Sequence, residues 1–236
     1  MAEAGAADAH ELRRFAYENP RPDVQAMVPA GVGRVLDLGC SSGALGAGLK
    51  QRDPAVEVVG VEVDPVYAAR AATRLDRVET ADVEAAFADP DRARSLVGDG
   101  FDCLICADVL EHLRDPEQAL ASAAALLRPG GVAIVSLPNV GYWQTHWSLF
   151  RHDRWPRHEM GIFDRTHLRW FTVLNAIELL ADAGVPVADP EADVQRVMKL
   201  RPFQPSRIDP RLPRLVPRRL RTLVTFQHVL RGRRVA

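Results

Sequence analysis

The residues of this 236-residue chain best suited to chemistry lie in a turn between a predicted strand and a predicted helix. The stretch VLDLGCSSGALG, from Val35 to Gly46, predicts the end of a buried strand, a turn with Gly39 and Gly43, and a helix start. Such a junction presents unpaired backbone N–H groups and the positive end of a helix dipole, and glycine leaves room for a ligand. The stretch therefore predicts a site for a nucleotide-like ligand.

The glycine spacing separates two classes of ligand. Dinucleotide enzymes use G-x-G-x-x-G, whereas Asp37, Gly39, Ser41 and Gly43 occupy every second position here. This spacing resembles motif I of the class I methyltransferases, [D/E]-x-G-x-G-x-G, with Ser41 in place of the middle glycine. The resemblance implies S-adenosylmethionine as cofactor, S-adenosylhomocysteine as product, and cofactor contacts from these four residues and Cys40. An αβ junction that binds nothing is the alternative.

An acidic residue ends the next predicted strand. The stretch VEVVGVEVD, from Val56 to Asp64, alternates apolar residues and carries Glu62 about twenty residues beyond the glycine turn. A carboxylate at a strand end accepts two hydrogen bonds from a ribose diol. We assign Glu62 and its neighbour Val63 to the cofactor site, with a solvent-exposed strand end as the alternative for Glu62.

Two further segments match the same family in order and spacing. After the short predicted strand Arg77–Thr80, the resemblance places Asp82 against the adenine amino group and the backbone N–H of Val83 against the ring; a helix-capping Asp is the alternative. The apolar run from Phe101 predicts a strand buried on both faces. It breaks at Ala107 and Asp108, which the resemblance places beside the methionine part of the cofactor.

Glu111 and His112 follow this break, and we interpret them as anchors of the loop beneath the pocket, with catalysis as the alternative. Cys103 and Cys106 lie three positions apart on the predicted strand, so they point to opposite faces. We therefore expect small buried residues rather than a redox pair.

The aromatic residues gather in the segment 141–171, which holds all four tryptophans and four of the seven histidines. Because this insertion follows the fifth strand, we expect it to form the roof of an apolar acceptor pocket. The residues predicted to bind the acceptor are Tyr17, Tyr142, Trp143, His146 and His167. The histidine spacing does not favour a metal site, and we predict none.

The segment GIFDRTHLRWFT, from Gly161 to Thr172, supplies the candidate base. A neutral imidazole is well matched to take the proton of an acceptor hydroxyl. His167 is the first candidate, with Asp164 holding its tautomer, and His146 is the second; histidines that only fix the loop are the alternative. The segment resembles a bacterial subgroup close to MetW-like and natural-product or surface-sugar tailoring methyltransferases.

These elements predict a Rossmann-like, doubly wound α/β fold with a mostly parallel sheet and helices on both faces. The resemblance to the class I methyltransferases implies that the sheet has seven strands and that the last strand is antiparallel. We expect an N-terminal helical lid at 1–32 and a methyltransferase domain at 33–236. The tail from Arg196 to Arg234 is basic and rich in proline, and its stretch TLVTFQHVLRG predicts the last strand.

The combined pattern predicts an S-adenosylmethionine-dependent methyltransferase that acts on a small-molecule acceptor, at oxygen, in secondary-metabolite or sugar tailoring. A regulatory protein that binds the donor without turnover, and an N- or C-methyltransferase including an RNA-modifying one, are the alternatives. An NAD-dependent oxidoreductase is disfavoured by the glycine spacing. The net charge of −1 gives no argument in favour of a polyanionic partner. No apolar run reaches about eighteen residues, so we expect a soluble, cytoplasmic protein without a membrane partner. The basic tail carries no nucleic-acid motif and no aromatic stacking platform, so we expect no nucleic-acid partner. A homodimer is left open.

Overall fold

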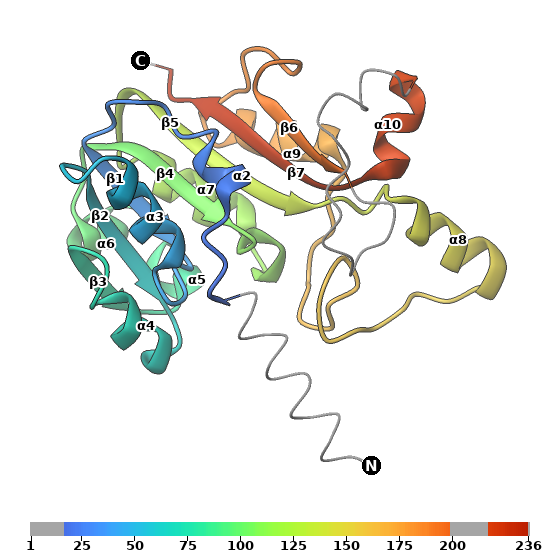
Figure 1. Cartoon of the computed structure of the whole chain (residues 1–236), viewed down its shortest axis with the longest axis horizontal. Helices are drawn as coiled ribbons and strands as arrows, with labels where there is room; N and C mark the ends of the chain where they lie inside the picture. Colours follow the sequence, from blue (N-terminus) through green and yellow to red (C-terminus); the bar gives the residue numbers. More distant parts are fainter. Residues whose placement is uncertain (1–16, 199–216, 236) are drawn as a thin grey trace.

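A mixed sheet with the strand order β3-β2-β1-β4-β5-β7-β6 forms the centre of the molecule (Figure 1). The computed structural model describes residues 17–198 and 217–235. The strands are β1 (Arg34–Leu38), β2 (Glu57–Glu62), β3 (Arg77–Thr80), β4 (Phe101–Ala107), β5 (Leu127–Pro138), β6 (Val194–Met198) and β7 (Thr225–Arg233). Strands β1 to β5 pair in parallel, whereas β7 is antiparallel to both β5 and β6. The predicted sheet is confirmed.

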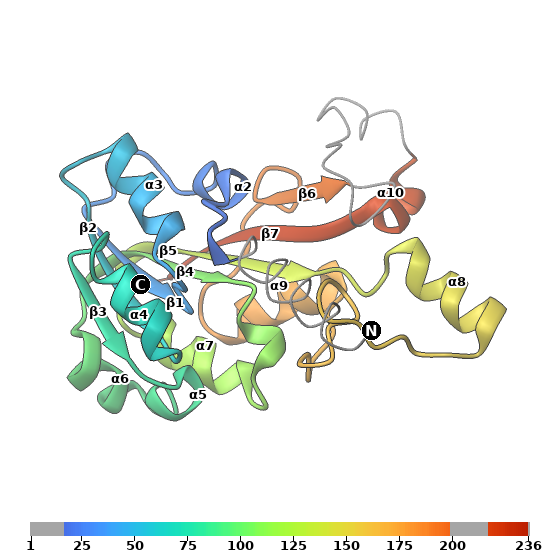
Figure 2. The same ribbon diagram turned by 60° about the horizontal axis from the view of Figure 1, so that its bottom comes forward.

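Helices cover both faces of this sheet (Figure 2). The helices are α2 (Pro22–Gln25), α3 (Ala44–Arg52), α4 (Pro65–Ala71), α5 (Val83–Ala86), α6 (Pro90–Val97), the 3₁₀ turn η1 (Leu110–His112), α7 (Pro116–Ala124), α8 (Trp143–His152), α9 (Val173–Asp182) and α10 (Arg218–Val224). One apolar core lies under α2, α3 and α4, and the other lies under α5, α6, α7 and α9. Cys106 belongs to the larger core and Cys103 to the other, and both are buried free thiols, as their spacing predicts.

Local sequence signals fix where the helices begin. Asp64 accepts a hydrogen bond from the backbone N–H of Val66, and Asp115 accepts one from that of Gln118, so each satisfies a donor at a helix N-terminus. A proline follows each of these caps, in the position where its missing N–H costs nothing. Because β1 to β5 pair in parallel, their carboxyl ends lie at one edge of the sheet, where doubly wound folds bind ligands.

The last strand is shorter than predicted. Residues 222–224 of the predicted strand close α10, and β7 begins at Thr225. The pairing of β6 with β7 completes the sheet, and the sequence analysis did not name β6. Most of the helix predicted from Asp8 to Glu18, and the irregular excursion predicted across the prolines at 202–213, lie outside the described residues.

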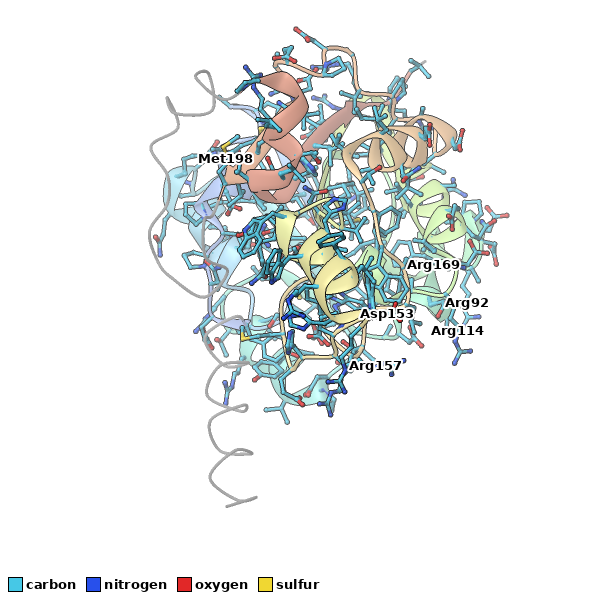
Figure 3. All side chains as sticks on the ribbon, turned by 90° about the vertical axis from the view of Figure 1, so that its right-hand side faces the viewer. Arg92, Arg114, Asp153, Arg157, Arg169 and Met198 are labelled. Atoms are coloured by element: carbon cyan, nitrogen blue, oxygen red, sulfur yellow. The ribbon has the colours of Figure 1, made fainter. Side chains whose placement is uncertain are left out.

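The insertion 141–171 leaves the sheet and returns to it. Its helix α8 projects away from the sheet in both views, with α10 beside it (Figures 1 and 2). Helix α8 faces the viewer in Figure 3. The segment rejoins the sheet where Asn139 forms a bridge with Phe171. Among residues 17–198 and 217–235, no helix combines the length and the apolar character that crossing a membrane requires.

Candidate active site

The glycine turn after β1 has the backbone conformation that its sequence demands. The φ angles of Gly39, Ser41 and Gly43 are 66°, 50° and 76°, all in the left-handed region. A Cβ on Gly39 would lie 2.4 Å from Cγ2 of Val109, so only glycine fits there. Ser41 is not a glycine, so its left-handed backbone costs about 1–2 kcal/mol of strain. Its N–H donates to Oε2 of Glu62 at 2.9 Å, which offsets part of that strain.

Glu62 joins the turn to the end of β2. Its second oxygen, Oε1, accepts from the N–H of Asp64 at 2.9 Å. Glu62, the residue predicted to bind the ribose, therefore also holds the loops around it in place. Val63 beside it is 63% exposed, whereas the Cys40 side chain is buried against Gly60, which leaves only its backbone for the cofactor.

Asp37 lies at the end of β1 and is 2% exposed. Within the described part of the chain, its Oδ2 atom has no hydrogen-bond partner. Burial, together with the nearby charge of Glu62, raises the pKa of Asp37 to about 7. A buried acceptor without a donor, beside a second carboxylate, fits a ligand that carries amino and hydroxyl groups, as S-adenosylmethionine does.

Asp82 is a helix cap, which is the alternative that its sequence left open. Its Oδ1 accepts from the N–H of Glu84 at 2.9 Å at the start of α5. Val83 is buried, and the adenine contacts of both residues stay a prediction.

A polar network that the sequence analysis missed joins the ends of three strands. The backbone of Arg21 is left-handed, with a φ of 49°. Its guanidinium donates to Asp108 and, at 2.8 Å, to Oγ of Ser136. Gln227 of β7 donates to the same two side chains. Burial alone would lower the pKa of Arg21, but the charges of Asp108 and Asp23 outweigh it and raise that pKa. The network attaches the segment before α2 to the strand ends.

The residues predicted to bind the acceptor do not form one surface. The Tyr17 carbonyl accepts from Oγ of Ser42 at 2.7 Å and its ring packs on Tyr67, so Tyr17 lies over the glycine turn. Tyr142 is fully buried in a small core with Ile162 and Phe163, and is a core residue rather than a pocket wall.

The two other predicted acceptor residues of this region lie on α8. Trp143 is 37% exposed at its start, and His146 is exposed farther along the same helix. Their roles at the site stay predictions.

The predicted partner of His167 is wrong. Oδ1 of Asp164 accepts from the N–H and Oγ1 of Thr166, at 2.9 and 2.7 Å. The Nδ1 atom of His167 instead lies 3.2 Å from the carbonyl oxygen of Ile162. Burial, helped by His112, lowers the pKa of His167, which keeps the ring neutral at pH 7.

Glu111 lies next to this imidazole. Its backbone carbonyl accepts from the N–H groups of Leu168 and Arg169, so the predicted anchoring role belongs to the backbone. Its carboxylate is buried, and neither oxygen has a hydrogen-bond partner among the described residues. Its Oε1 is 4.0 Å from Nε2 of His167. Burial, and next the charge of Asp108, raise the pKa of Glu111 well above its usual range.

Comparisons with curated proteins extend these observations. The chain is 36% identical over 114 residues to the ubiquinone biosynthesis O-methyltransferase of Alkalilimnicola ehrlichii, covering 45% of this chain and 42% of that protein. It is 30% identical over 176 residues to the trans-aconitate 2-methyltransferase of Escherichia coli O157:H7, covering 73% and 66%. The chain spans about half the length of several curated relatives that it matches.

Solved structures share the fold. A methyltransferase of Thermotoga maritima, described as a possible histamine N-methyltransferase, superposes with a TM-score of 0.60 at 20% identity, covering 98% of this chain and 94% of that one. The putative methyltransferase that binds the Trm112 activator in Haloferax volcanii gives a TM-score of 0.62 at 18% identity, with coverage of 99% and 96%. The MetW-like subgroup stays a prediction.

A family model described as a methyltransferase domain matches residues 8–188. That range contains the glycine turn, Glu62, the strand ends at Asp108 and Ser136, and the His167 segment. The chain therefore belongs to the methyltransferase-domain family.

Proposed function

We propose that this enzyme transfers a methyl group to an oxygen atom of a small-molecule acceptor, in the tailoring of a secondary metabolite or a sugar. The observation that carries the proposal is the neutral imidazole of His167 beside the buried carboxylate of Glu111, just beyond the end of β4. An acceptor hydroxyl must lose its proton as its oxygen is methylated, and polar groups at this place suit that demand.

The remaining residues divide into a donor side and an acceptor side. Bound S-adenosylmethionine supplies an activated methyl group. On the donor side we place the glycine turn and two carboxylates: Asp37, whose buried Oδ2 has no donor among the described residues, and Glu62 at the end of β2. On the acceptor side, the insertion 141–171 forms the roof. We propose residues 17–32 as the described part of a lid, which Arg21 holds against the strand ends so that water is excluded.

The names of the relatives support an oxygen acceptor in one respect. One curated relative is named an O-methyltransferase of ubiquinone biosynthesis, a reaction on a small molecule. A regulatory protein without turnover, and an enzyme that methylates nitrogen or carbon, including that of RNA, stay as alternatives to this proposal.

The experiment uses S-adenosylmethionine labelled in its methyl group and three matched acceptor panels: phenols and sugar hydroxyls, carboxylic acids, and amines. Mass spectrometry of the products is expected to find the label on oxygen. Label on nitrogen or carbon alone would replace the proposal with the second alternative, and donor binding without any labelled product would favour the regulatory protein.

His167→Ala tests the role of the imidazole in the same assay. We expect nearly unchanged donor affinity and a turnover lowered by about 10²–10⁴-fold. His152→Ala changes an exposed histidine at the end of α8 and serves as the control. Full turnover of His167→Ala across the pH range would show that proximity alone drives the transfer.

A further inference from the structure

Three side chains from two segments far apart in the sequence converge beside the end of β4. Glu111, His112 and His167 each offer one ligand atom, and these atoms lie within 4.8 Å of one another. The two imidazole rings meet edge to face with centroids 4.8 Å apart. The Glu111 carboxylate, 1% exposed, has no hydrogen-bond partner among the described residues. Because a buried carboxylate without a partner is costly, its position calls for a ligand.

The hydrogen bonds at Nδ1 fix the tautomer of each histidine and leave its other ring nitrogen as an acceptor. Nδ1 of His167 lies 3.2 Å from the Ile162 carbonyl, which can only accept, so Nδ1 carries the proton. Nδ1 of His112 lies 3.1 Å from Oγ1 of Thr166, whose own hydrogen is donated to Asp164 at 2.7 Å. Nδ1 of His112 is therefore also a donor. In each ring Nε2 is left as a bare acceptor.

The backbone holds the two segments in fixed register. The Glu111 carbonyl accepts from the N–H groups of Leu168 and Arg169 at 2.8 and 3.0 Å. The Arg169 side chain donates through Nε to the Arg114 carbonyl at 3.1 Å, and Figure 3 shows these two arginines on the same side of the molecule. The cluster is thus assembled on a hydrogen-bonded frame rather than on free loops, as a precise binding site requires.

We propose that Glu111, His112 and His167 bind one divalent metal ion of the zinc class. Two imidazoles and one carboxylate form a ligand set that catalytic zinc sites use, with at least one position left for water or substrate. Metal-binding histidines usually donate their second ring nitrogen to a carbonyl, a carboxylate or another fixed acceptor, as both histidines do here. Metal–ligand bonds of about 2.0–2.2 Å need donors roughly 3–4 Å apart, and the three ligand atoms here lie within 4.8 Å of one another.

The proposed ion would change how the enzyme activates its acceptor, and this part rests on the proposed function. An acceptor hydroxyl in the open coordination position has a lowered pKa, so it loses its proton to water without a protein base. The resulting oxygen forms the bond to the methyl carbon while the carbon–sulfur bond breaks and its electron pair returns to sulfur. With the ion bound, the lone pair of His167 is held by the metal, so its part in the proposed function is to place the ion rather than to take the acceptor proton itself.

The first test measures metal binding without any turnover. The purified chain is dialysed against a chelator and titrated with Zn²⁺ by calorimetry and with Co²⁺ by visible absorption. We expect about one ion per chain, with a Co²⁺ spectrum typical of nitrogen and oxygen ligands. His167→Ala, His112→Ala and Glu111→Gln should each weaken binding at least about tenfold. The matched controls are His152→Ala and Glu117→Gln, which change exposed side chains outside the cluster.

Folding of each variant is checked by circular dichroism and by S-adenosylmethionine binding, so that lost metal binding is not mistaken for unfolding. Absence of stoichiometric binding to the wild type, or equal weakening by the control variants, would overturn the proposal. The two proposals fail separately. Methylation of an oxygen acceptor at full rate in the presence of chelator would refute the metal and keep the proposed function. Zn²⁺ binding that depends on the cluster, in a protein that methylates only amines, would keep the metal site and refute the proposed function.

Discussion

Glu62 holds two loops of the proposed donor site at once. Its carboxylate accepts from Ser41 and Asp64, so it holds the strained glycine turn as well as the end of β2. Substitution of Glu62 should therefore weaken ligand binding, because losing either hydrogen bond loosens a loop beside the ligand.

Glu62→Ala is expected to weaken S-adenosylmethionine binding by about 1–3 kcal/mol, through lost charge-assisted hydrogen bonds to the ribose and a less ordered turn. Calorimetry with the donor or with S-adenosylhomocysteine measures it. Glu57→Ala, at the opposite end of the same strand and paired with Arg34, is the control. Unchanged affinity in Glu62→Ala, or NAD binding in place of the donor, would contradict the assignment.

Arg21 is the cation of the polar network at the strand ends. Arg21→Ala leaves Asp108 and Asp23 without their guanidinium partner, and we expect the free energy of unfolding to fall by about 1–3 kcal/mol, less than for a fully buried pair because Asp108 is partly exposed. Chemical denaturation measures the change. Arg94→Ala breaks an exposed pair with Asp91 and should change stability by less than about 0.5 kcal/mol. Equal effects of the two variants would show that the network contributes no special stability.

At the scale of the element, two consecutive residues of β7 have different surroundings, one in the polar network and one in the interior. Gln227 donates to Asp108 and Ser136 in the polar network, whereas the next residue, His228, is 2% exposed. Neither ring nitrogen of His228 has a hydrogen-bond partner in the described parts of the chain. Burial, and next the charge of Arg196, lower the pKa of His228 to about 3.

This shift makes stability depend on pH in a defined direction. Between the unfolded pKa of about 6.5 and the folded pKa, the unfolded chain binds a proton at His228 and the folded chain does not. The free energy of unfolding therefore falls as the pH falls below about 6.5, by up to about 1.4 kcal/mol per pH unit from this residue. His228→Leu should give a shallower slope between pH 7 and 5 in urea denaturation. His152→Leu, at an exposed position, should keep the wild-type slope; parallel profiles for His228→Leu and wild type would refute the assignment.

At the scale of the whole molecule, the basic C-terminal stretch contributes to the closure of the sheet where it is described. Arg231 pairs with Asp193, Arg233 donates to the Gly130 carbonyl at 2.8 Å, and Arg234 donates to the Ala125 carbonyl at 2.9 Å. These arginines bind the protein's own carboxylate and carbonyl groups, which leaves them poorly placed to neutralise phosphates.

We therefore expect no tight binding to duplex DNA or structured RNA at physiological salt. Fluorescence anisotropy with labelled duplexes and a structured RNA measures this, with a salt series from low to physiological concentration. Strong affinity that falls steeply with salt would contradict the expectation and bring the RNA-modifying alternative forward.

The sequence by itself determined the parallel part of the sheet and the glycine turn after its first strand. The strand at Arg77–Thr80 and the break of the central strand at Ala107 and Asp108 were predicted where the structure has them. Periodicity, caps and glycine turns depend on residues a few positions apart, so they are legible in the chain.

The tertiary structure alone decided which distant side chains meet. Asp164 is three positions before His167, yet its carboxylate accepts from Thr166, and the Ile162 carbonyl accepts the hydrogen bond of the imidazole Nδ1 instead. The contact of Glu111 with His167 spans two segments that only the folded sheet brings together. Spacing along the chain carries no information on such contacts, because backbone pairing and side-chain rotamers in the packed core set them.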